Sequence, residues 1–175
     1  MLKIKPVSQV DNYQEYTLFN LIPKNENGFK NEFSGVSYEQ YARDVLNTLN
    51  KRTLGIDLNE NQVPSTFYTL WLDDKAIGLF TFNHRLNDFL KNGSGHICFY
   101  ILKEYRNQGY ATIGLRLLLE QIKDIVYEDE VYMSCNKSNQ ASLKVQLKNS
   151  ATIYHQDKHF VYTKITVKTN LVQKG

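Results

Sequence analysis

A single amphipathic helix constrains the fold of this chain more than any other segment. Five apolar residues recur at steps of four and three residues, so they share one face of a helix: Ala111, Leu115, Leu118, Ile122 and Ile125. Charged residues fall largely on the opposite side of the same segment. Because a helix with one apolar face must bury that face against another layer, we expect a sheet or further helices beneath it.

Segments with strand character lie on both sides of this helix. Residues 66–72 and 76–82 are rich in β-branched and aromatic residues, and the turn residues 73–75 between them predict a hairpin. Residues 96–102 predict a third strand before the helix, and residues 131–135 predict a fourth strand after it.

The C-terminal part predicts one more helix and a closing hairpin. Residues 138–148 indicate a short helix, with Ser138 or Asn136 as its N-cap. Residues 151–155 and 160–167 predict the two strands of the hairpin.

The N-terminal part is predicted to be mainly helical. Apolar residues over 38–49 recur at helical spacing, with Ser37 as N-cap and Gln40 three residues after it. A weaker helix is indicated over 8–19, and the polar residues 23–32 are typical of a surface loop. Together these elements predict an α/β domain with a mixed sheet.

Composition is that of an ordinary globular protein. The 175 residues are 42% hydrophobic and 22% charged, which excludes wholesale disorder and predicts a single domain over residues 1–175. The 21 Lys and Arg against 18 Asp and Glu give too small an excess to indicate a nucleic-acid partner. Two cysteines, Cys98 and Cys135, cannot form a disulfide framework and suit reduced thiols. Because no stretch has the apolar length of a signal peptide or a spanning helix, we expect a soluble cytoplasmic protein with no membrane partner.

The loop before the amphipathic helix has the properties of an anion site. Backbone amides at a helix N-terminus are unpaired and the helix dipole there is positive, so a loop entering such a helix suits phosphates. Gly109 allows a tight backbone turn, Ala111 is small, and Arg106 adds a charge suited to phosphate. Neither a dinucleotide fingerprint nor a P-loop matches the chain. An ordinary strand-to-helix turn is the alternative at this point.

The same loop carries a family resemblance. Arg-x-x-Gly-x-Ala at 106–111, after an apolar strand and before a long helix, resembles the acetyl-CoA motif of the GNAT superfamily of N-acetyltransferases. Residues 139–142, Asn-Gln-Ala-Ser, look like that family's Asn-x-x-Ala/Ser segment. The likeness covers about residues 63–168, is strongest over 95–145, and extends to one bacterial branch of predicted acetyltransferases. It implies a GNAT-like single domain with a mixed, mostly antiparallel central sheet, a splayed strand pair and flanking helices.

The resemblance also implies how acetyl-CoA is held. The amides of residues 108–111 would hold the pyrophosphate with help from the Thr112 hydroxyl, and the pantetheine arm would pair with the strand. The Ile101 amide would polarise the thioester carbonyl, and Asn139 and Ser142 would lie near the pantetheine or the sulfur. The implied cofactor-binding residues are Phe99, Ile101, Arg106, Asn107, Gln108, Gly109, Tyr110, Ala111, Thr112, Asn139 and Ser142.

The implied reaction is direct attack of an unidentified amine acceptor on acetyl-CoA. Such an attack needs a base, and His96 and His84 are our candidates because histidine titrates near neutral pH. Gln146 stands where many family members carry a Tyr that acts as acid, and Tyr154 is a candidate substitute. The alternatives left open are a non-catalytic acyl-CoA-binding module with the same fold and an unrelated α/β nucleotide binder.

Other features bear on partners. His155 and His159 have the spacing of a zinc pair on a helix, but the residues between them are typical of a turn, so we expect no metal ion. Dimers are common in the family, which makes a homodimer one expectation. A set of aromatic residues either lines an acceptor pocket or packs the first helices onto the sheet: Phe29, Phe33, Tyr38 and Tyr41.

Overall fold

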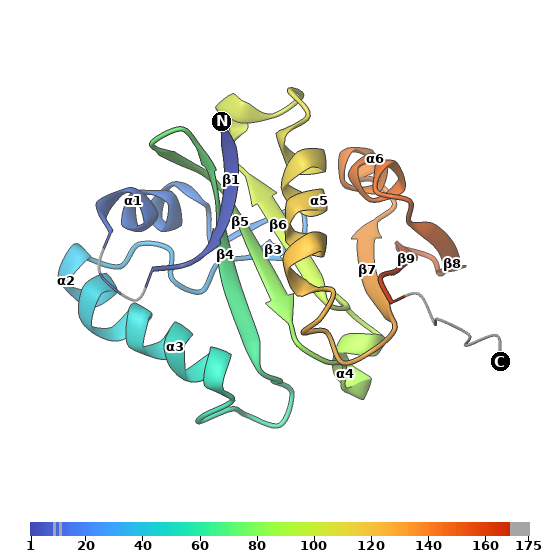
Figure 1. Cartoon of the computed structure of the whole chain (residues 1–175), viewed down its shortest axis with the longest axis horizontal. Coiled ribbons are helices and arrows are strands. Elements are labelled where there is room, and N and C mark those ends of the chain that lie inside the picture. The colour runs from blue at the N-terminus through green and yellow to red at the C-terminus, as the bar shows by residue number, and fades with distance from the viewer. Residues whose placement is uncertain (9, 11, 169–175) are drawn as a thin grey trace, which may run out of the picture.

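The computed structural model describes residues 1–8, 10 and 12–168 (Figure 1). Its elements follow one another along the chain as β1 (Leu2–Pro6), α1 (Tyr13–Leu21), β2 (Asn25–Glu26), β3 (Phe29–Lys30), α2 (Tyr38–Gln40), a π-helical turn (Tyr41–Val45), α3 (Leu46–Leu54), β4 (Ser65–Leu72), β5 (Lys75–Asn83), α4 (Asp88–Lys91), β6 (Ile97–Ile101), a 3-10 turn (Lys103–Tyr105), α5 (Tyr110–Ile122), β7 (Glu130–Asn136), α6 (Gln140–Lys148), β8 (Thr152–Gln156) and β9 (Phe160–Thr166).

The strands form two larger antiparallel sheets that meet at one point. One sheet has the order β1-β4-β5-β6 and the other the order β7-β9-β8. They are joined where Gly95 pairs with Met133 and where the His96 amide donates to the Tyr132 carbonyl at 2.7 Å. No ladder joins β6 to β7 beyond this point in the described part of the chain. The two strands therefore separate, which confirms the expected splayed pair within an α/β fold.

Helix α5 covers one face of the four-stranded sheet, as the apolar pattern predicted. Leu115, Leu118 and Ile122 are fully buried in a core cluster that includes side chains from all four strands of this sheet. The prediction for Ile125 was wrong: α5 ends at Ile122, and Ile125 lies in the following turn with 52% of its surface exposed. Val126 is buried in its place. The turn after the helix changes the direction of the chain, so the helical spacing no longer predicts which side chains face the sheet.

The packing of α5 is close enough to fix its position on the sheet. A Cβ atom added at Gly114 would lie 2.7 Å from the Phe80 ring, nearer than real side chains approach one another. This close packing therefore fixes the position of the N-terminal half of α5 relative to the sheet.

The other face of the sheet is covered by the N-terminal helices (Figure 1). The segment from Tyr38 to Leu54 is helical throughout, and Ser37 and Gln40 form the predicted capping box. The weaker helix begins later than predicted, because Asn12 caps it by accepting from the amides of the first turn.

Three local predictions need correction. Strand β1 was not predicted, although Leu2 and Ile4 alternate with lysines as in an edge strand. Residues 23–32 contain the small β2–β3 hairpin rather than a loose loop. The N-cap of α6 is Asn139, because Asn136 instead accepts from the amide and hydroxyl of Ser138 in the preceding turn.

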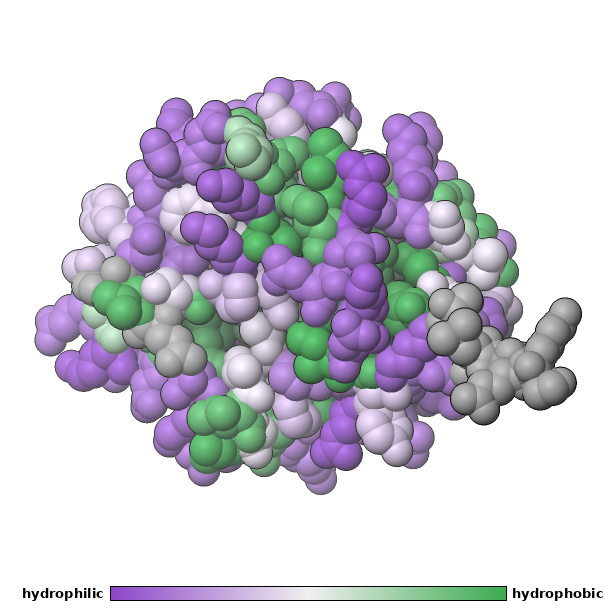
Figure 2. All heavy atoms as spheres, in the orientation of Figure 1, coloured by the Kyte–Doolittle hydropathy of each residue, from purple (hydrophilic) through white to green (hydrophobic). Residues whose placement is uncertain are grey.

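Among the described residues, no helix is both long and apolar enough to cross a bilayer. Figure 2 shows a face covered mainly by hydrophilic residues, with smaller hydrophobic patches between them.

Candidate functional site

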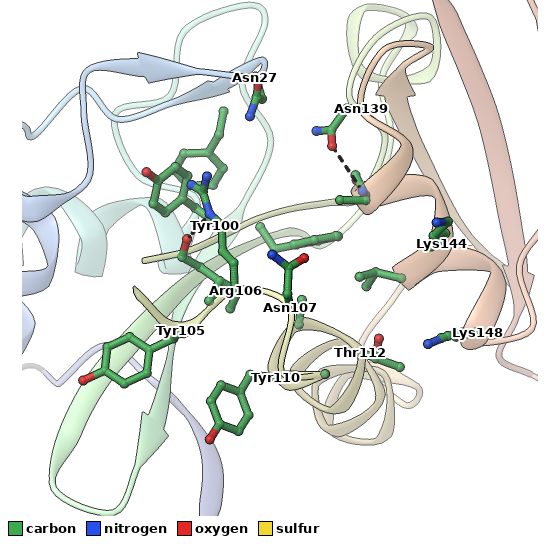
Figure 3. A pocket seen from close by; sticks show the side chains of 18 of the residues that line it. Asn27, Tyr100, Tyr105, Arg106, Asn107, Tyr110, Thr112, Asn139, Lys144 and Lys148 are labelled. Carbon is green, nitrogen blue, oxygen red and sulfur yellow. Dashed lines mark hydrogen bonds between the residues drawn. The ribbon is translucent and has the colours of Figure 1, made fainter. Parts of the chain in front are cut away.

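A cavity of about 410 Å³ opens where β6 and β7 separate (Figure 3). Its walls come from β6, the loop before α5, the first turn of α5, one face of α6, and the β2–β3 hairpin. Ten of the eleven predicted cofactor-binding residues line it. The exception is Gln108, whose side-chain amide donates to the Glu104 carbonyl at 3.1 Å on the exposed side of the loop. The sequence thus predicted most of the wall formed by β6, the loop and α5, and two residues of the wall formed by α6.

The loop before α5 presents unpaired backbone amides to the cavity. Asn107 and Gly109 have positive φ angles, 61° and 81°, which turn the backbone into the helix. Gly109 is the N-cap and no side chain caps it, and the first bond into the helix runs from the Ile113 amide to the Gly109 carbonyl at 3.1 Å. The amides before Ile113 therefore lack helical partners, as an anion site requires.

Strand β6 presents backbone groups to the same cavity along its open edge. The Leu102 amide donates to the Ile77 carbonyl at 2.9 Å, and bonding in an antiparallel ladder alternates along the strand. Tyr100 is therefore bonded to β5, whereas the amides and carbonyls of Phe99 and Ile101 point away from β5. Because β7 has already diverged, the Phe99 groups and the Ile101 amide can pair with an extended ligand, whereas the Ile101 carbonyl already accepts from Arg106.

The first turn of α6 forms the opposite wall. The side-chain oxygen of Asn139 accepts from the Ser142 amide at 3.2 Å, so Asn139 is a helix cap that also lines the cavity. The Ser142 hydroxyl accepts from the Gln146 amide group at 3.2 Å, and Gln146 accepts from the Thr163 hydroxyl at 2.6 Å. Gln146 is 1% exposed, so it is part of the buried support of α6.

Two lysines that the sequence analysis did not single out add positive charge to this wall. Lys144 and Lys148 lie one turn apart on α6 and both line the cavity. In Figure 3 the Lys148 side chain points toward Thr112 on α5. Their spacing of four residues was the available signal, since it places both side chains on one helix face.

The far end of the cavity contains a charged cluster from three parts of the chain. The Arg106 guanidinium donates to the Ile101 carbonyl at 2.9 Å and to the Glu26 carboxylate at 3.1 Å, and lies 4.9 Å from the centre of the Tyr100 ring. The Tyr100 hydroxyl donates to the same carboxylate, and Lys103 lies 3.4 Å from it.

These contacts shift the acidity of both acidic members of the cluster. Hydrogen bonds from Tyr100 and then Arg106 lower the pKa of Glu26 to about 2. Burial, followed by the bond to Glu26, raises the pKa of Tyr100 to about 12. The sequence analysis missed Glu26, because its contacts are 74 and 80 residues away along the chain and nothing in its own segment indicates them.

His96 lies outside the cavity and is fully buried. One ring nitrogen lies 2.8 Å from the Glu128 carboxylate, and the other accepts from the Tyr132 amide at 2.9 Å. Burial lowers the pKa of His96 more than Glu128 raises it. The histidine therefore braces the point where the two sheets meet.

His84 lines a different cavity of about 300 Å³, between α3 and strand β4. Its ring nitrogen lies 2.8 Å from the Thr66 hydroxyl, the ring stacks on Phe82, and burial lowers the pKa of His84. The structure thus brings neither predicted base, His84 or His96, to the cavity at β6. Their catalytic roles stay predictions.

The remaining candidates lie mostly elsewhere. Tyr154 is 43% exposed and packs edge-on against Tyr132 on the second sheet. Of the four aromatic residues considered for an acceptor pocket, Phe29 lines the cavity. The others pack in the N-terminal layer: Phe33, Tyr38 and Tyr41. Among the described residues no group of three or more His, Cys, Asp or Glu side chains could hold a metal ion.

The chain matches the family model described as the acetyltransferase (GNAT) family over residues 29–148. No curated protein matches it. The solved structures that resemble it include Campylobacter jejuni N-acetyltransferase PseH in complex with acetyl coenzyme A, with 18% identity, a TM-score of 0.60, and coverage of 95% of this chain and 99% of that one.

Two further solved structures resemble it over nearly their whole length. RimL, a ribosomal alpha-N-protein acetyltransferase in complex with coenzyme A, has 15% identity, a TM-score of 0.67, and coverage of 94% of this chain and 93% of that one. An N-acetyltransferase from Staphylococcus aureus Mu50 has 14% identity, a TM-score of 0.61, and coverage of 96% and 99%. At these identities the likeness shows the fold.

Proposed function

The chain belongs to the acetyltransferase (GNAT) family, and on that premise we propose that it transfers the acetyl group of acetyl-CoA directly to an amine. One observation carries this proposal: unpaired amides at the start of α5 and the open edge of β6 border the same cavity. A ligand with phosphates at one end and an extended, amide-bearing arm at the other matches both features. The structures of PseH in complex with acetyl coenzyme A and of RimL in complex with coenzyme A support this choice of donor.

We assign the phosphate end of the donor to the loop and to the first turn of α5. The amides of residues 108–111 would bind the pyrophosphate, with Asn107 beside them and the Thr112 hydroxyl as an additional donor. Lys144 and Lys148 face this region across the cavity and would add electrostatic attraction for the phosphates.

We assign the pantetheine arm to the open edge of β6. The backbone groups of Phe99 and the amide of Ile101 point away from β5, so the arm would pair with them as an added strand, with Asn139 and Ser142 on its other side. The thioester would then lie near the Ile101 amide. A hydrogen bond from this amide to the carbonyl oxygen would stabilise the negative charge that develops there during attack.

In the proposed reaction the amine nitrogen forms a bond to the carbonyl carbon, and the carbon–sulfur bond then breaks. The attacking amine loses one proton, and the departing thiolate takes one up. Gln146 cannot supply that proton, since it is an amide held between Ser142 and Thr163.

We keep His96 and His84 as candidates for the general base, each acting through water because neither ring lines the cavity. To take up a proton, His96 would have to give up its bond to Glu128 or to the Tyr132 amide. Loss of a positioned base typically lowers the rate by ~10²–10⁴-fold. If His96→Ala and His84→Ala both keep the full rate, neither histidine is the base, and water in the cavity accepts the proton of the amine.

Thiol release tests the proposed function. The protein is incubated with acetyl-CoA and a panel of amines that includes peptide N-termini, lysine derivatives and small amines, and free thiol is followed over time. We expect amine-dependent thiol release and an acetylated product by mass spectrometry. Binding of acetyl-CoA without release for any amine would favour the alternative of a non-catalytic acyl-CoA-binding module.

Thermal unfolding distinguishes the remaining alternative, an unrelated α/β nucleotide binder, from the acetyltransferase and the acyl-CoA-binding module. A ligand that binds only the folded state raises the unfolding temperature. We expect CoA to raise it and ATP and NAD to leave it unchanged. The reverse pattern would indicate an unrelated nucleotide binder.

A further inference from the structure

The side chain of Arg106 is turned away from the site assigned to the phosphates. In Figure 3 it lies beside Tyr100, whereas Asn107, the next residue, lies toward Thr112 and α6. Two of its N–H groups have acceptors already, the Ile101 carbonyl at 2.9 Å and the Glu26 carboxylate at 3.1 Å. Its contacts therefore differ from those expected of a phosphate-binding arginine.

We propose that Arg106 is a positioning residue that fixes the Ile101 carbonyl and thereby aims the Ile101 amide at the thioester of the donor. This role rests on the proposed acetyl transfer. The amide and the carbonyl of one residue leave an antiparallel strand on the same side. Ile101 is the last residue of β6, and no neighbouring strand of the described residues pairs with this side of it. A bond to the carbonyl there restricts the rotation that would also swing the amide.

The charge around Arg106 argues against a phosphate role. The Glu26 carboxylate neutralises the guanidinium, and Tyr100 contributes both its ring face and a hydroxyl bond to the same carboxylate. Hydrogen bonds between charged groups are among the stronger ones in proteins. To bind Arg106, a phosphate would have to displace such a bond, the one that Arg106 already donates to Glu26. The low pKa of Glu26 is consistent with a carboxylate that keeps its charge beside Arg106.

Glu26 extends the same arrangement to the β2–β3 hairpin. Its carboxylate accepts from a second nitrogen of the guanidinium, Nη2, while Nε donates to Ile101. Phe29, which pairs with Glu26 in the hairpin, packs on Tyr100 with 5.6 Å between ring centres. Arg106 therefore joins the hairpin, the end of β6 and the loop before α5.

The variants that test this role separate geometry from charge. Arg106→Gln removes the cation, and Arg106→Lys keeps the charge but cannot donate to both acceptors with a planar fork. Glu26→Gln leaves Arg106 in place but removes the ion pair. Lys103→Gln is the matched control, because Lys103 lies beside the same carboxylate, is 70% exposed, and has no bond to Ile101.

The main readout is the infrared stretching frequency of acetyl-CoA labelled with ¹³C at the acetyl carbonyl, measured when bound. A hydrogen bond from the Ile101 amide polarises this carbonyl and lowers its frequency. We expect the lowered frequency in the wild-type protein and in Lys103→Gln. We expect it to return toward the free value in Arg106→Gln and Arg106→Lys, and in part in Glu26→Gln.

Binding and turnover give the second readout. Acetyl-CoA affinity measured by calorimetry should be nearly unchanged in the Arg106 variants, whereas kcat with a reactive amine should fall by up to about 10²-fold, the cost of a misplaced catalytic group. A lost phosphate contact would instead weaken acetyl-CoA by roughly tenfold or more, and less so at high salt.

Several results would overturn the role of Arg106. They are an unchanged frequency in both Arg106 variants, an equal change in Lys103→Gln, an unshifted carbonyl in the wild-type protein, or a salt-dependent loss of acetyl-CoA affinity at constant frequency. Failure of the wild-type protein to bind acetyl-CoA would overturn the proposed function together with this role. Normal binding with any of the former results overturns the role of Arg106 alone.

Discussion

Replacing Gly109 by alanine tests whether the backbone of the loop before α5 is the phosphate site. Gly109 has a φ angle of 81°, and a Cβ added there would meet nothing within 4 Å. The substitution therefore creates no clash, and its cost is the left-handed backbone conformation, about 1–2 kcal/mol for a residue with a side chain. In a chain of this length that corresponds to a fall in Tm of roughly 2–8 °C.

The expected loss of affinity is larger than this stability cost implies. The variant can relieve its strain by rotating Gly109 toward negative φ, which turns the first amides of α5 away from the ligand. Loss of one or two bonds from amides to a charged phosphate would weaken CoA by about 10–100-fold or more. Gly109→Val should abolish measurable binding, because a β-branched residue tolerates this conformation less.

Gly35 provides a matched control for this experiment. It has the same φ angle of 81°, is also exposed, and has nothing within 4 Å of an added Cβ. Gly35→Ala should therefore lose a similar amount of stability by thermal unfolding and keep wild-type CoA affinity by calorimetry. Equal CoA affinity in Gly109→Ala and Gly35→Ala, at equal stability, would refute the assignment of the loop.

Three further predictions concern the other parts of the site. Asn139→Ala should lower the unfolding free energy by about 0.5–2 kcal/mol through loss of the cap. It should also weaken the binding of acetyl-CoA, while a nucleotide fragment without the pantetheine arm binds as before. Normal acetyl-CoA affinity in this variant would leave Asn139 as a helix cap alone. Lys144→Gln and Lys148→Gln should each weaken CoA and reduce the salt dependence of its affinity, measured by calorimetry at two ionic strengths; unchanged salt dependence would exclude them from the phosphate end. The folded-state pKa of Glu26 is about 2, below the ordinary value of 4.5, so its ionised form stabilises the fold above pH 4.5 and this contribution is lost as the pH falls toward 2. Urea unfolding of Glu26→Gln should therefore show a smaller loss of stability over that pH range than unfolding of the wild-type protein. Equal losses in the two proteins would contradict the pairing of Glu26.

The elements that the sequence predicted well are those with local or periodic signals. The strand–turn–strand pattern over 66–82 and the apolar face of α5 depend on neighbouring residues, and both are in the structure. The anion-site argument for the loop at Gly109 is equally local, since it needs only a strand, a turn and a helix in sequence. The cap of α6 was placed wrongly because Asn136, Ser138 and Asn139 are all good caps and only the turn geometry chooses among them.

The features that the sequence did not predict depend on contacts between distant segments. Glu26 reaches the cavity through the packing of a two-residue strand on β6, and no pattern in residues 23–32 indicates that packing. The motif predicted the position of Arg106 on the loop but not the direction of its side chain, which Glu26 and Ile101 determine. His96 was considered as a base from its place beside the cofactor strand, and its burial against Glu128 depends on the junction of the two sheets.

The most direct test of the central claim is a nuclear magnetic resonance titration of the backbone amides with acetyl-CoA. If acetyl-CoA occupies the cavity at the splayed strands, the largest shifts will be those of residues 107–112 and of Phe99 and Ile101, with smaller shifts at the start of α6. The pantetheine arm alone should move Phe99 and Ile101 and leave the amides of residues 108–111 unchanged. Shifts centred on the second cavity beside His84, with none in the loop before α5, would contradict the account.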